Sequence, residues 1–255
     1  MSIDASPDET EAIVLVKAAP NIGRMHGETV CCAAVDFEGN WLRLYPISFF
    51  NLDEDQRFGR WDRICFKCSL PHNDSRIESR RVVQSSLKIV GQLKKSKREN
   101  FLENVIVTGL KKEREQGKSL ALLRAKNIKF DYEKKNADKI REDEYKFREY
   151  RAQMSFFNQS QIPYEPCPYR FIYHYESDDG KRVGTCQDWE TEITYQRRER
   201  EHGEVKALDE MCKIFGEEYP KKGMLFAMGT HSQYPDTWLI NGIVRLDEIK
   251  QLRLL

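Results

Sequence analysis

Residues 28–46 read ETVCCAAVDFEGNWLRLYP, and this stretch decides the fold class. Two apolar runs, 28–37 and 41–46, flank the tripeptide Glu38-Gly39-Asn40. Gly and Asn adopt the left-handed backbone conformations that tight hairpin turns require, while β-branched and aromatic residues favour strands. The stretch therefore predicts an antiparallel β-hairpin in the N-terminal part of the chain.

Further short strands are expected on both sides of this hairpin. Residues 11–18 and 60–67 are strand-like, while 78–93 contain two runs separated by Gln-Ser-Ser. Many short strands joined by tight turns, with little helix between them, are typical of a small barrel or a strongly curved sheet. We expect an SH3-like or OB-like barrel, and the sequence does not decide between the two.

The second half of the chain mixes helices and strands. A heavily charged helix is expected from 137 to about 157, and the string NQSQIP at 158–163 is a candidate linker. The last third contains two hairpins and two helices, with Asp188 at the N-cap of the first helix. The predicted fold class is therefore α+β, with a β-rich barrel-like domain over 1–130, a charged helix and linker over 131–160, and an α+β domain over 161–255.

Aromatic side chains alternate along the strand expected at 168–176, where Tyr169, Phe171, Tyr173 and Tyr175 share one face. Such a stripe is a stacking platform in proteins that bind single-stranded nucleic acid, which makes Tyr173 and Tyr175 candidate base contacts. The alternative is a core face covered by helices, and we favour it because Tyr packs well on half-buried sheets.

The neighbouring His174 and Cys186 suggest a nucleophilic pair, but the expected strand register separates them. An even loop around Asp178-Asp179 places Phe171 opposite Cys186 and leaves His174 on the other face. A Cys/His nucleophile needs both side chains within hydrogen-bond reach. The register therefore argues against this site, although an odd loop or a bulge would reverse the faces.

Charge is distributed unevenly along the chain. Twelve Lys or Arg and four Glu lie between Lys88 and Lys129, a net charge of +8, so the remainder carries −7 within a total of +1. Dense cations contact phosphates, although interspersed Glu residues also fit a solvated, ion-paired helix face. The candidate nucleic-acid-binding residues form two clusters: Lys94, Lys95, Lys97 and Arg98, then Lys111, Lys112, Arg114 and Lys118.

A second candidate site lies at 226–240, FAMGTHSQYPDTWLI, where two apolar arms flank a polar loop. His231 could act as an acid or base or contact a phosphate, and Asp236 could orient it in a catalytic pair. The sequence supplies no nucleophile, metal set or glycine-rich phosphate loop beside them. We therefore favour a turn, with Trp238 anchoring the second arm in the core.

Neither a metal nor a cofactor is expected. The CxxC pair Cys65 and Cys68 lies on an expected strand, where positions i and i+3 point to opposite faces, so the thiols do not converge on zinc. The seven scattered cysteines and the acidic N-terminus without a signal sequence predict reduced thiols and a cytoplasmic location. No apolar run is long enough to span a membrane.

The strings RFGRWD (57–62), CQDWE (186–190) and GTHSQYPDTW (229–238) resemble an uncharacterised family of bacterial proteins without an assigned activity. The resemblance extends loosely along the whole chain. It implies a bacterial cytosolic protein, and no catalytic residue can be transferred from it.

Three classes of function follow from these features. The leading hypothesis is a nucleic-acid-binding protein, an accessory component of a bacterial multi-protein system, with DNA or RNA and other proteins of that system as partners. The second is a hydrolase or nuclease whose site includes His231 and Asp236. The third is a protein–protein adapter whose basic segment binds an acidic partner. A basic groove without a catalytic pocket would favour the first hypothesis.

Overall fold

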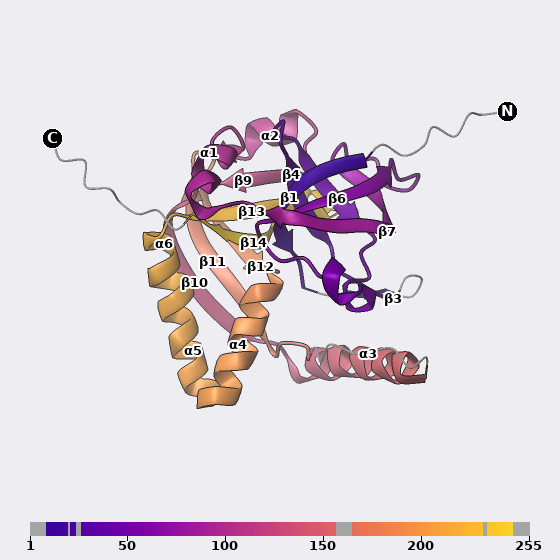
Figure 1. The fold of residues 1–255 in the computed structure, drawn as a ribbon. Helices are drawn as coiled ribbons and strands as arrows, with labels where there is room; N and C mark the ends of the chain where they lie inside the picture. The colour runs from indigo at the N-terminus through magenta and orange to yellow at the C-terminus, as the bar shows by residue number, and fades with distance from the viewer. Residues whose placement is uncertain (1–8, 20, 24–26, 157–164, 232–233, 247–255) are drawn as a thin grey trace.

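The computed structural model describes residues 9–19, 21–23, 27–156, 165–231 and 234–246. It consists of a closed barrel followed by a mixed seven-stranded sheet with helices, as Figure 1 shows. The α+β class predicted from the sequence is thus confirmed. The domain divisions at 130 and 160 stay a prediction, and the candidate linker at 158–163 lies outside the described residues.

The barrel contains five strands that close in the order β1-β4-β5-β7-β6. The third and fifth strands along the chain, β5 and β7, pair in parallel, and the other neighbours are antiparallel. This connectivity is that of an OB-type Greek-key barrel. The strands are β1 (Glu9–Lys17), β4 (Cys32–Asp36), β5 (Trp41–Tyr45), β6 (Asp62–Ser69) and β7 (Ser79–Gln92).

The hairpin expected at 28–46 forms between β4 and β5. Asp36 closes its turn by accepting hydrogen bonds on its side chain from the backbone N–H groups of Glu38 and Asn40, at 2.9 and 2.8 Å. Gly39 occupies the left-handed region with φ of +87°, which explains why glycine is suited to this position. The local sequence alone therefore defines this hairpin.

Residues 79–92 form one long strand, whereas the sequence predicted two strands separated by Gln-Ser-Ser. The strand bends at a register shift relative to β6 between Cys65 and Lys67. Ser86 fits there because its hydroxyl accepts from the Lys67 N–H at 2.8 Å and donates to the Val83 carbonyl at 2.6 Å. The polar serine thus satisfies backbone groups at a bulge and does not end the strand.

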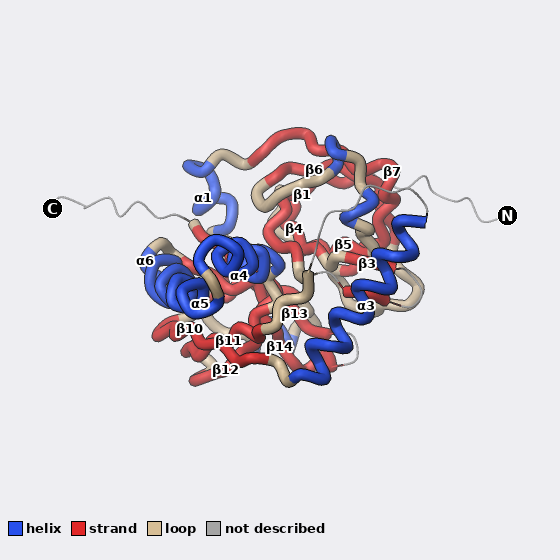
Figure 2. Tube along the Cα trace, turned by 90° about the horizontal axis from the view of Figure 1, so that it is seen from below, coloured by secondary structure: helices blue, strands red, loops and turns tan. Residues whose placement is uncertain are grey.

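The second unit is a sheet in the order β10-β11-β12-β14-β13-β9-β8, with α4, α5 and α6 over one face (Figure 2). Its strands are β8 (Ile106–Val107), β9 (Leu120–Leu123), β10 (Lys126–Lys134), β11 (Tyr169–Ser177), β12 (Gly180–Cys186), β13 (Met224–His231) and β14 (Tyr234–Arg245). The helices are α1 (Arg98–Leu102), α2 (Lys111–Glu115), α3 (Ala137–Phe156), α4 (Trp189–His202), α5 (Glu204–Lys213) and α6 (Tyr219–Lys221). Short elements complete the fold: β2 (Asn21–Gly23), β3 (Gly27–Thr29), the 3-10 turns η1 (Phe49–Asn51), η2 (Glu54–Gln56) and η3 (Lys95–Lys97), and the π-helical turn η4 (Ile214–Glu218).

The register of the β11–β12 hairpin agrees with the prediction, since Phe171 pairs with Cys186 and His174 with Val183. His174 is exposed while Cys186 is buried, so the two side chains do not form a nucleophilic pair. The aromatic stripe of β11 faces inward and packs with Tyr195 of α4 and Phe226 of β13. The four aromatic side chains of this stripe therefore form part of the core, which is the interpretation that the sequence favoured.

The sheet covers the outer surface of the β4–β5 hairpin. Ala33, Val35 and Trp41 belong to one buried cluster together with residues of β9, β13 and β14, namely Leu120, Leu122, Leu225, Ala227 and Val244. In OB-type barrels this face of the second and third strands commonly carries the oligonucleotide. Here Ala33, Val35 and Trp41 of this face form a hydrophobic interface within the chain.

None of the helices within the described ranges is both long and apolar enough to cross a membrane.

Candidate functional site

The first basic cluster occupies the turn η3 and the start of α1. Lys94, Lys95 and Lys97 are exposed, whereas Arg98 is half-buried. The Arg98 guanidinium lies 4.4 Å from the centroid of the Trp61 ring, within the range of a cation–π contact. This cluster therefore combines exposed charge with one cation held against the barrel.

The second basic cluster lies on α2 and the turn that follows it. Arg114 forms an ion pair with Asp236 at 3.0 Å, and Lys118 forms one with Glu113 at 2.7 Å. Lys111 and Lys112 are exposed on the same short helix. Two of the four cations in this cluster are therefore paired with carboxylates.

Tyr173 and Tyr175 are 0% and 5% exposed, so neither ring offers a face to a ligand. Burial raises the pKa of both hydroxyls above the usual value. A base stacks only on a ring that solvent can reach. The structure therefore places these two candidates in the core of the sheet, away from any surface on which nucleic acid could lie.

His231 and Asp236 lie on β13 and β14, and the strands extend further toward the hairpin tip than the sequence predicted. His231 pairs with Tyr234 across the two strands, and residues 232 and 233 lie outside the described chain. The Asp236 carboxylate bonds Arg114, and its side chain is 72% exposed. Trp238 is partly buried against the core of the sheet.

A buried ion pair that was not expected from the sequence joins the barrel to α4. The Arg60 Nη2 lies 3.0 Å from the Asp188 Oδ2 and 3.2 Å from the Glu190 Oε2. The side chains of Arg60 and Asp188 are 14% and 2% exposed. Asp188 also accepts from the backbone N–H groups of Glu190 and Ile243, at 3.0 and 2.7 Å. One carboxylate thus caps α4 and links it to β14 and the barrel.

Burial raises the pKa of the Asp188 carboxyl, and Arg60 and the Ile243 N–H oppose this effect by favouring the carboxylate. The surrounding carboxylates in turn raise the pKa of Arg60 despite its burial. The Arg60 Nε, also buried, has no hydrogen-bond acceptor among the described residues. A buried donor without an acceptor is costly, by about 1–3 kcal/mol.

Arg60 lines a cavity of about 330 Å³ between the barrel and the helices, a volume at the lower end of small-molecule sites. Two further arginines, Arg98 and Arg245, line the same cavity, and the Arg245 guanidinium lies 4.5 Å from the centroid of the Tyr219 ring. The remaining lining residues include Trp61, Asp188, Glu190, Thr191, Thr194, Phe215 and Ile243. Three arginines and two carboxylates thus line this cavity.

The backbone of Trp61, at the wall of this cavity, adopts φ of +72°, a conformation that bulky residues rarely take. Two hydrogen bonds hold it, from the Trp61 N–H to the Val14 carbonyl at 2.7 Å and from the Leu93 N–H to the Trp61 carbonyl at 2.8 Å. Strained residues of this kind cluster at functional sites. The conformation holds the Trp61 ring beneath Arg98.

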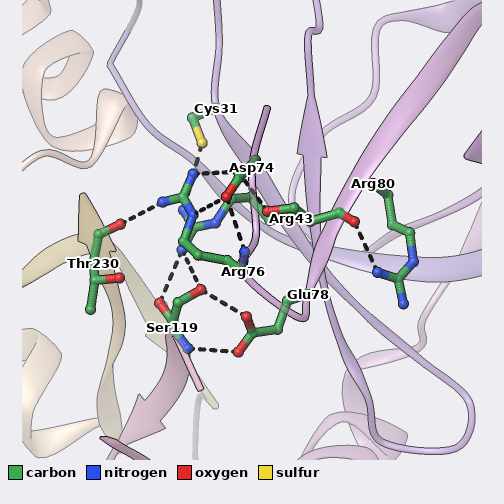
Figure 3. Close-up of polar contacts among 9 residues, drawn as sticks. Cys31, Arg43, Asp74, Arg76, Glu78, Arg80, Ser119 and Thr230 are labelled. Carbon is green, nitrogen blue, oxygen red and sulfur yellow. Dashed lines mark hydrogen bonds and ion pairs between the residues drawn. The ribbon is translucent and has the colours of Figure 1, made fainter. Parts of the chain in front are cut away.

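A second buried polar network fixes the barrel to the sheet (Figure 3). Glu78, 5% exposed, accepts from both the N–H and the hydroxyl of Ser119 at 2.7 Å. Arg43 donates to the Ser119 carbonyl at 3.0 Å, and Arg76 donates to the Thr230 carbonyl at 2.8 Å. The junction between barrel and sheet therefore combines this polar network with the apolar cluster around Trp41.

No group of three or more His, Cys, Asp or Glu side chains gathers around a potential metal position in the described part of the chain. Cys65 and Cys68 lie on β6, and Cys68 contacts the Thr10 hydroxyl at 3.6 Å. Burial raises the pKa of the Cys65 thiol. The expectation of a protein without zinc stays a prediction for elemental analysis.

The sequence singled out Asp188 only as a helix cap and did not single out Arg60 or Arg245. The available signal was the pair of strings RFGRWD and CQDWE, which contain Arg60 and Asp188. Nothing in either string shows that they meet, because strand order and helix packing decide that contact.

Comparisons with known proteins add a family and no activity. A search of curated proteins finds no match. A solved structure titled "Structure and Conformational Change of a Replication Protein A Heterotrimer Bound to ssDNA" matches at 10% identity and a TM-score of 0.25, and the match covers 94% of this chain and 66% of the other, just under two thirds. Because this TM-score is so low, no property of that protein is carried over.

Two family models divide the chain close to the junction between barrel and sheet. One, a domain of unknown function (DUF8758), matches residues 8–108. The other, also a domain of unknown function (DUF8757), matches residues 106–254. These matches confirm the expectation of an uncharacterised family. Because the second model matches more than half of the residues of this chain, the chain belongs to the DUF8757 family.

Proposed function

We propose that this protein binds nucleic acid, and that the turn η3 with the start of α1 provides its main contact with phosphates. The observation that carries the proposal is the concentration of cations at one place. Three exposed lysines, Lys94, Lys95 and Lys97, lead directly into Arg98, which lines the arginine-rich cavity. Phosphate contacts supply most of the non-specific affinity of such proteins.

What the fold buries supports this position for the proposed interface. The outer face of the β4–β5 hairpin lies under the sheet, and Tyr173 and Tyr175 lie in the core. Binding through the barrel face or through the β11 stripe would require taking apart a hydrophobic core. The lysine turn is exposed and requires no such change.

The proposed role is that of an accessory component in a bacterial system acting on DNA or RNA. The experiment measures affinity for single- and double-stranded DNA and RNA by fluorescence anisotropy at two or more salt concentrations. The wild-type protein should bind at least one of them and weaken with salt. Each neutralised phosphate contributes about 0.9 to the log–log slope on duplex DNA and about 0.7 on single strands.

The decisive variant carries Lys94→Glu, Lys95→Glu and Lys97→Glu. It should lose at least about tenfold in affinity at low salt, and its salt slope should fall by about 2–3. A matched control places the same change in charge on α3, which Figures 1 and 2 show well away from α1, using Lys139→Glu, Arg141→Glu and Lys146→Glu. Equal loss in both variants, or binding that ignores salt, would refute the proposal.

A further inference from the structure

We infer that a base of a single-stranded nucleic acid stacks on the ring of Phe37, and that the protein therefore prefers single strands to duplexes. Phe37 lies in the turn between β4 and β5 and is 55% exposed. The inference deepens the proposed function and rests on it, because the phosphates beside that base would contact the lysine turn at 94–97.

The turn that carries Phe37 is held by hydrogen bonds within the hairpin. The Asp36 N–H donates to the Asn40 carbonyl at 3.0 Å, and the Gly39 N–H donates to the Asp36 carbonyl at 3.2 Å. The Asp36 carboxylate also accepts from the side-chain amide of Asn40 at 3.0 Å. A backbone that is already ordered loses less conformational entropy when a ligand binds. Phe37 is thus presented in a preorganised position.

Two side chains from other segments contact the Phe37 ring. The Arg63 guanidinium, from β6, lies 5.3 Å from the ring centroid. The Phe101 ring, from α1, packs edge-on, with the two centroids 5.8 Å apart and the planes at 70°. Arg63 is itself held by Glu11, whose carboxylate accepts from the Arg63 Nη2 at 2.9 Å. Phe37 stays largely exposed with both neighbours in place, so part of its ring remains available to a base.

Exposed cations lie beside this ring. Lys97 precedes Phe101 by four residues, about one helical turn, so both lie on the same side of that segment. Lys94 is exposed at the start of the turn, where its carbonyl accepts from the Lys97 N–H at 2.9 Å. Because Phe101 contacts Phe37, the two lysines and the exposed ring belong to one continuous surface.

This combination of ring and cations suits a single strand. The bases of a duplex are stacked on one another inside the helix, whereas an unpaired base can place its face on an aromatic side chain. Glu38 follows Phe37 in the turn and is exposed, so it would repel a phosphate at the ring. A neutral base therefore fits at Phe37, and the phosphates of the same strand fit at the lysines.

The first experiment compares ligands by fluorescence anisotropy at low salt. Wild-type protein should bind a single-stranded oligonucleotide more tightly than the duplex of the same sequence or an abasic strand of the same length. Phe37→Ala and Phe37→Leu should bind the single strand about tenfold more weakly, because neither offers an aromatic face. Their affinities for the duplex and the abasic strand should not change, and Phe37→Trp should retain wild-type affinity.

DNA and RNA strands are measured in parallel. The loss should appear with both, because stacking involves the base and not the sugar. A loss confined to one of them would assign that nucleic acid as the ligand. An equal loss on single, duplex and abasic strands would contradict the inference, since it would not depend on an exposed base.

The second experiment uses Phe37→Trp as a reporter. A base that stacks on an indole quenches its fluorescence, so the emission of this variant should fall with the single strand and stay constant with the abasic strand. The matched control is Val205→Trp, at a position that is 76% exposed on α5, which Figures 1 and 2 show away from α1. Equal quenching of both variants, or no quenching of Phe37→Trp while the strand is bound, would overturn the inference.

The inference and the proposed function give different results when they fail. If the wild-type protein binds no nucleic acid, both are wrong. If the triple Lys→Glu variant at 94, 95 and 97 loses affinity while Phe37→Ala binds every strand like the wild type, the proposed function stands and the inference is wrong. Because Phe37 is exposed, Phe37→Ala should leave the melting curve unchanged, which separates lost binding from lost folding.

Discussion

Arg60 and Asp188 lie 128 residues apart in the chain and form a 3.0 Å ion pair between the barrel and the first turn of α4. Asp188 is almost wholly removed from solvent. Ions are costly to bury, and their attraction offsets that cost only when the geometry is good and the remaining oxygens are hydrogen-bonded. The N–H groups of Glu190 and Ile243 meet that condition.

Removing one partner of this pair should destabilise the protein strongly. Arg60→Met leaves Asp188 buried without its counter-ion, and we expect a loss of about 3–5 kcal/mol in the free energy of unfolding. Asp188→Asn retains a helix cap, since Asn is among the best N-cap residues, but it leaves Arg60 with only Glu190. Urea denaturation of both single variants and of the double variant gives the coupling energy. Simple addition of the two losses would show that the residues do not act as a pair.

The free energy of unfolding should depend on pH through the ionisation of Asp74. Burial alone would raise its pKa, but hydrogen bonds from Arg76 and Ser79 outweigh this and lower the pKa to about 2. Because this pKa is lower in the folded than in the unfolded chain, the stabilisation is complete above pH ~4 and disappears as the pH falls toward 2. We expect about 1–2 kcal/mol after allowance for solvent screening.

Urea denaturation between pH 6 and 3 tests this expectation. Asp74→Asn should flatten the dependence over that range, whereas Asp138→Asn, at a side chain that is 89% exposed, should leave it unchanged. A wild-type dependence that survives in Asp74→Asn would assign the effect to other carboxylates.

The barrel should not be stable without the sheet. A fragment of residues 1–108 would expose Val35, Trp41 and their neighbours, which are now covered by β9, β13 and β14. Apolar burial contributes about 25 cal/mol per Å², and exposed patches of this kind promote aggregation. We expect the fragment to aggregate or to unfold without cooperativity, and to recover when it is expressed together with residues 106–255. A soluble fragment with a sharp melting transition would show that the two units fold independently.

Two substitutions in the hairpin of β13 and β14 can distinguish a functional site from a purely structural turn. Trp238 is partly buried against the core of the sheet, so Trp238→Ala should cost about 1–3 kcal/mol, less than for a wholly buried Trp. His231 is exposed, and His231→Ala should leave both the melting curve and nucleic-acid binding unchanged. Loss of binding or of any hydrolytic activity in a folded His231→Ala protein would instead support the hypothesis of a catalytic site.

The amino-acid sequence by itself determined features that depend on neighbouring residues. The turn at Gly39 follows from the left-handed conformation that glycine allows. Phe171 pairs with Cys186 because side chains alternate between the two faces of a strand. Asp188 caps α4 because the first N–H groups of a helix have no partner within the helix. Each of these needs only a few consecutive residues, so a single sequence is enough to predict them.

The tertiary structure alone decided which surfaces meet. Trp41 and Val35 have the pattern of a strand with a free outer face, and only the packing of the sheet shows that this face is buried. Arg60 and Asp188 come together because barrel closure and the position of α4 bring two distant loops to one point. Such contacts depend on the free energy of the whole chain and leave no periodicity in the sequence. The arginine cavity, with Arg98 and Arg245 on separate elements, is therefore visible only in the folded protein.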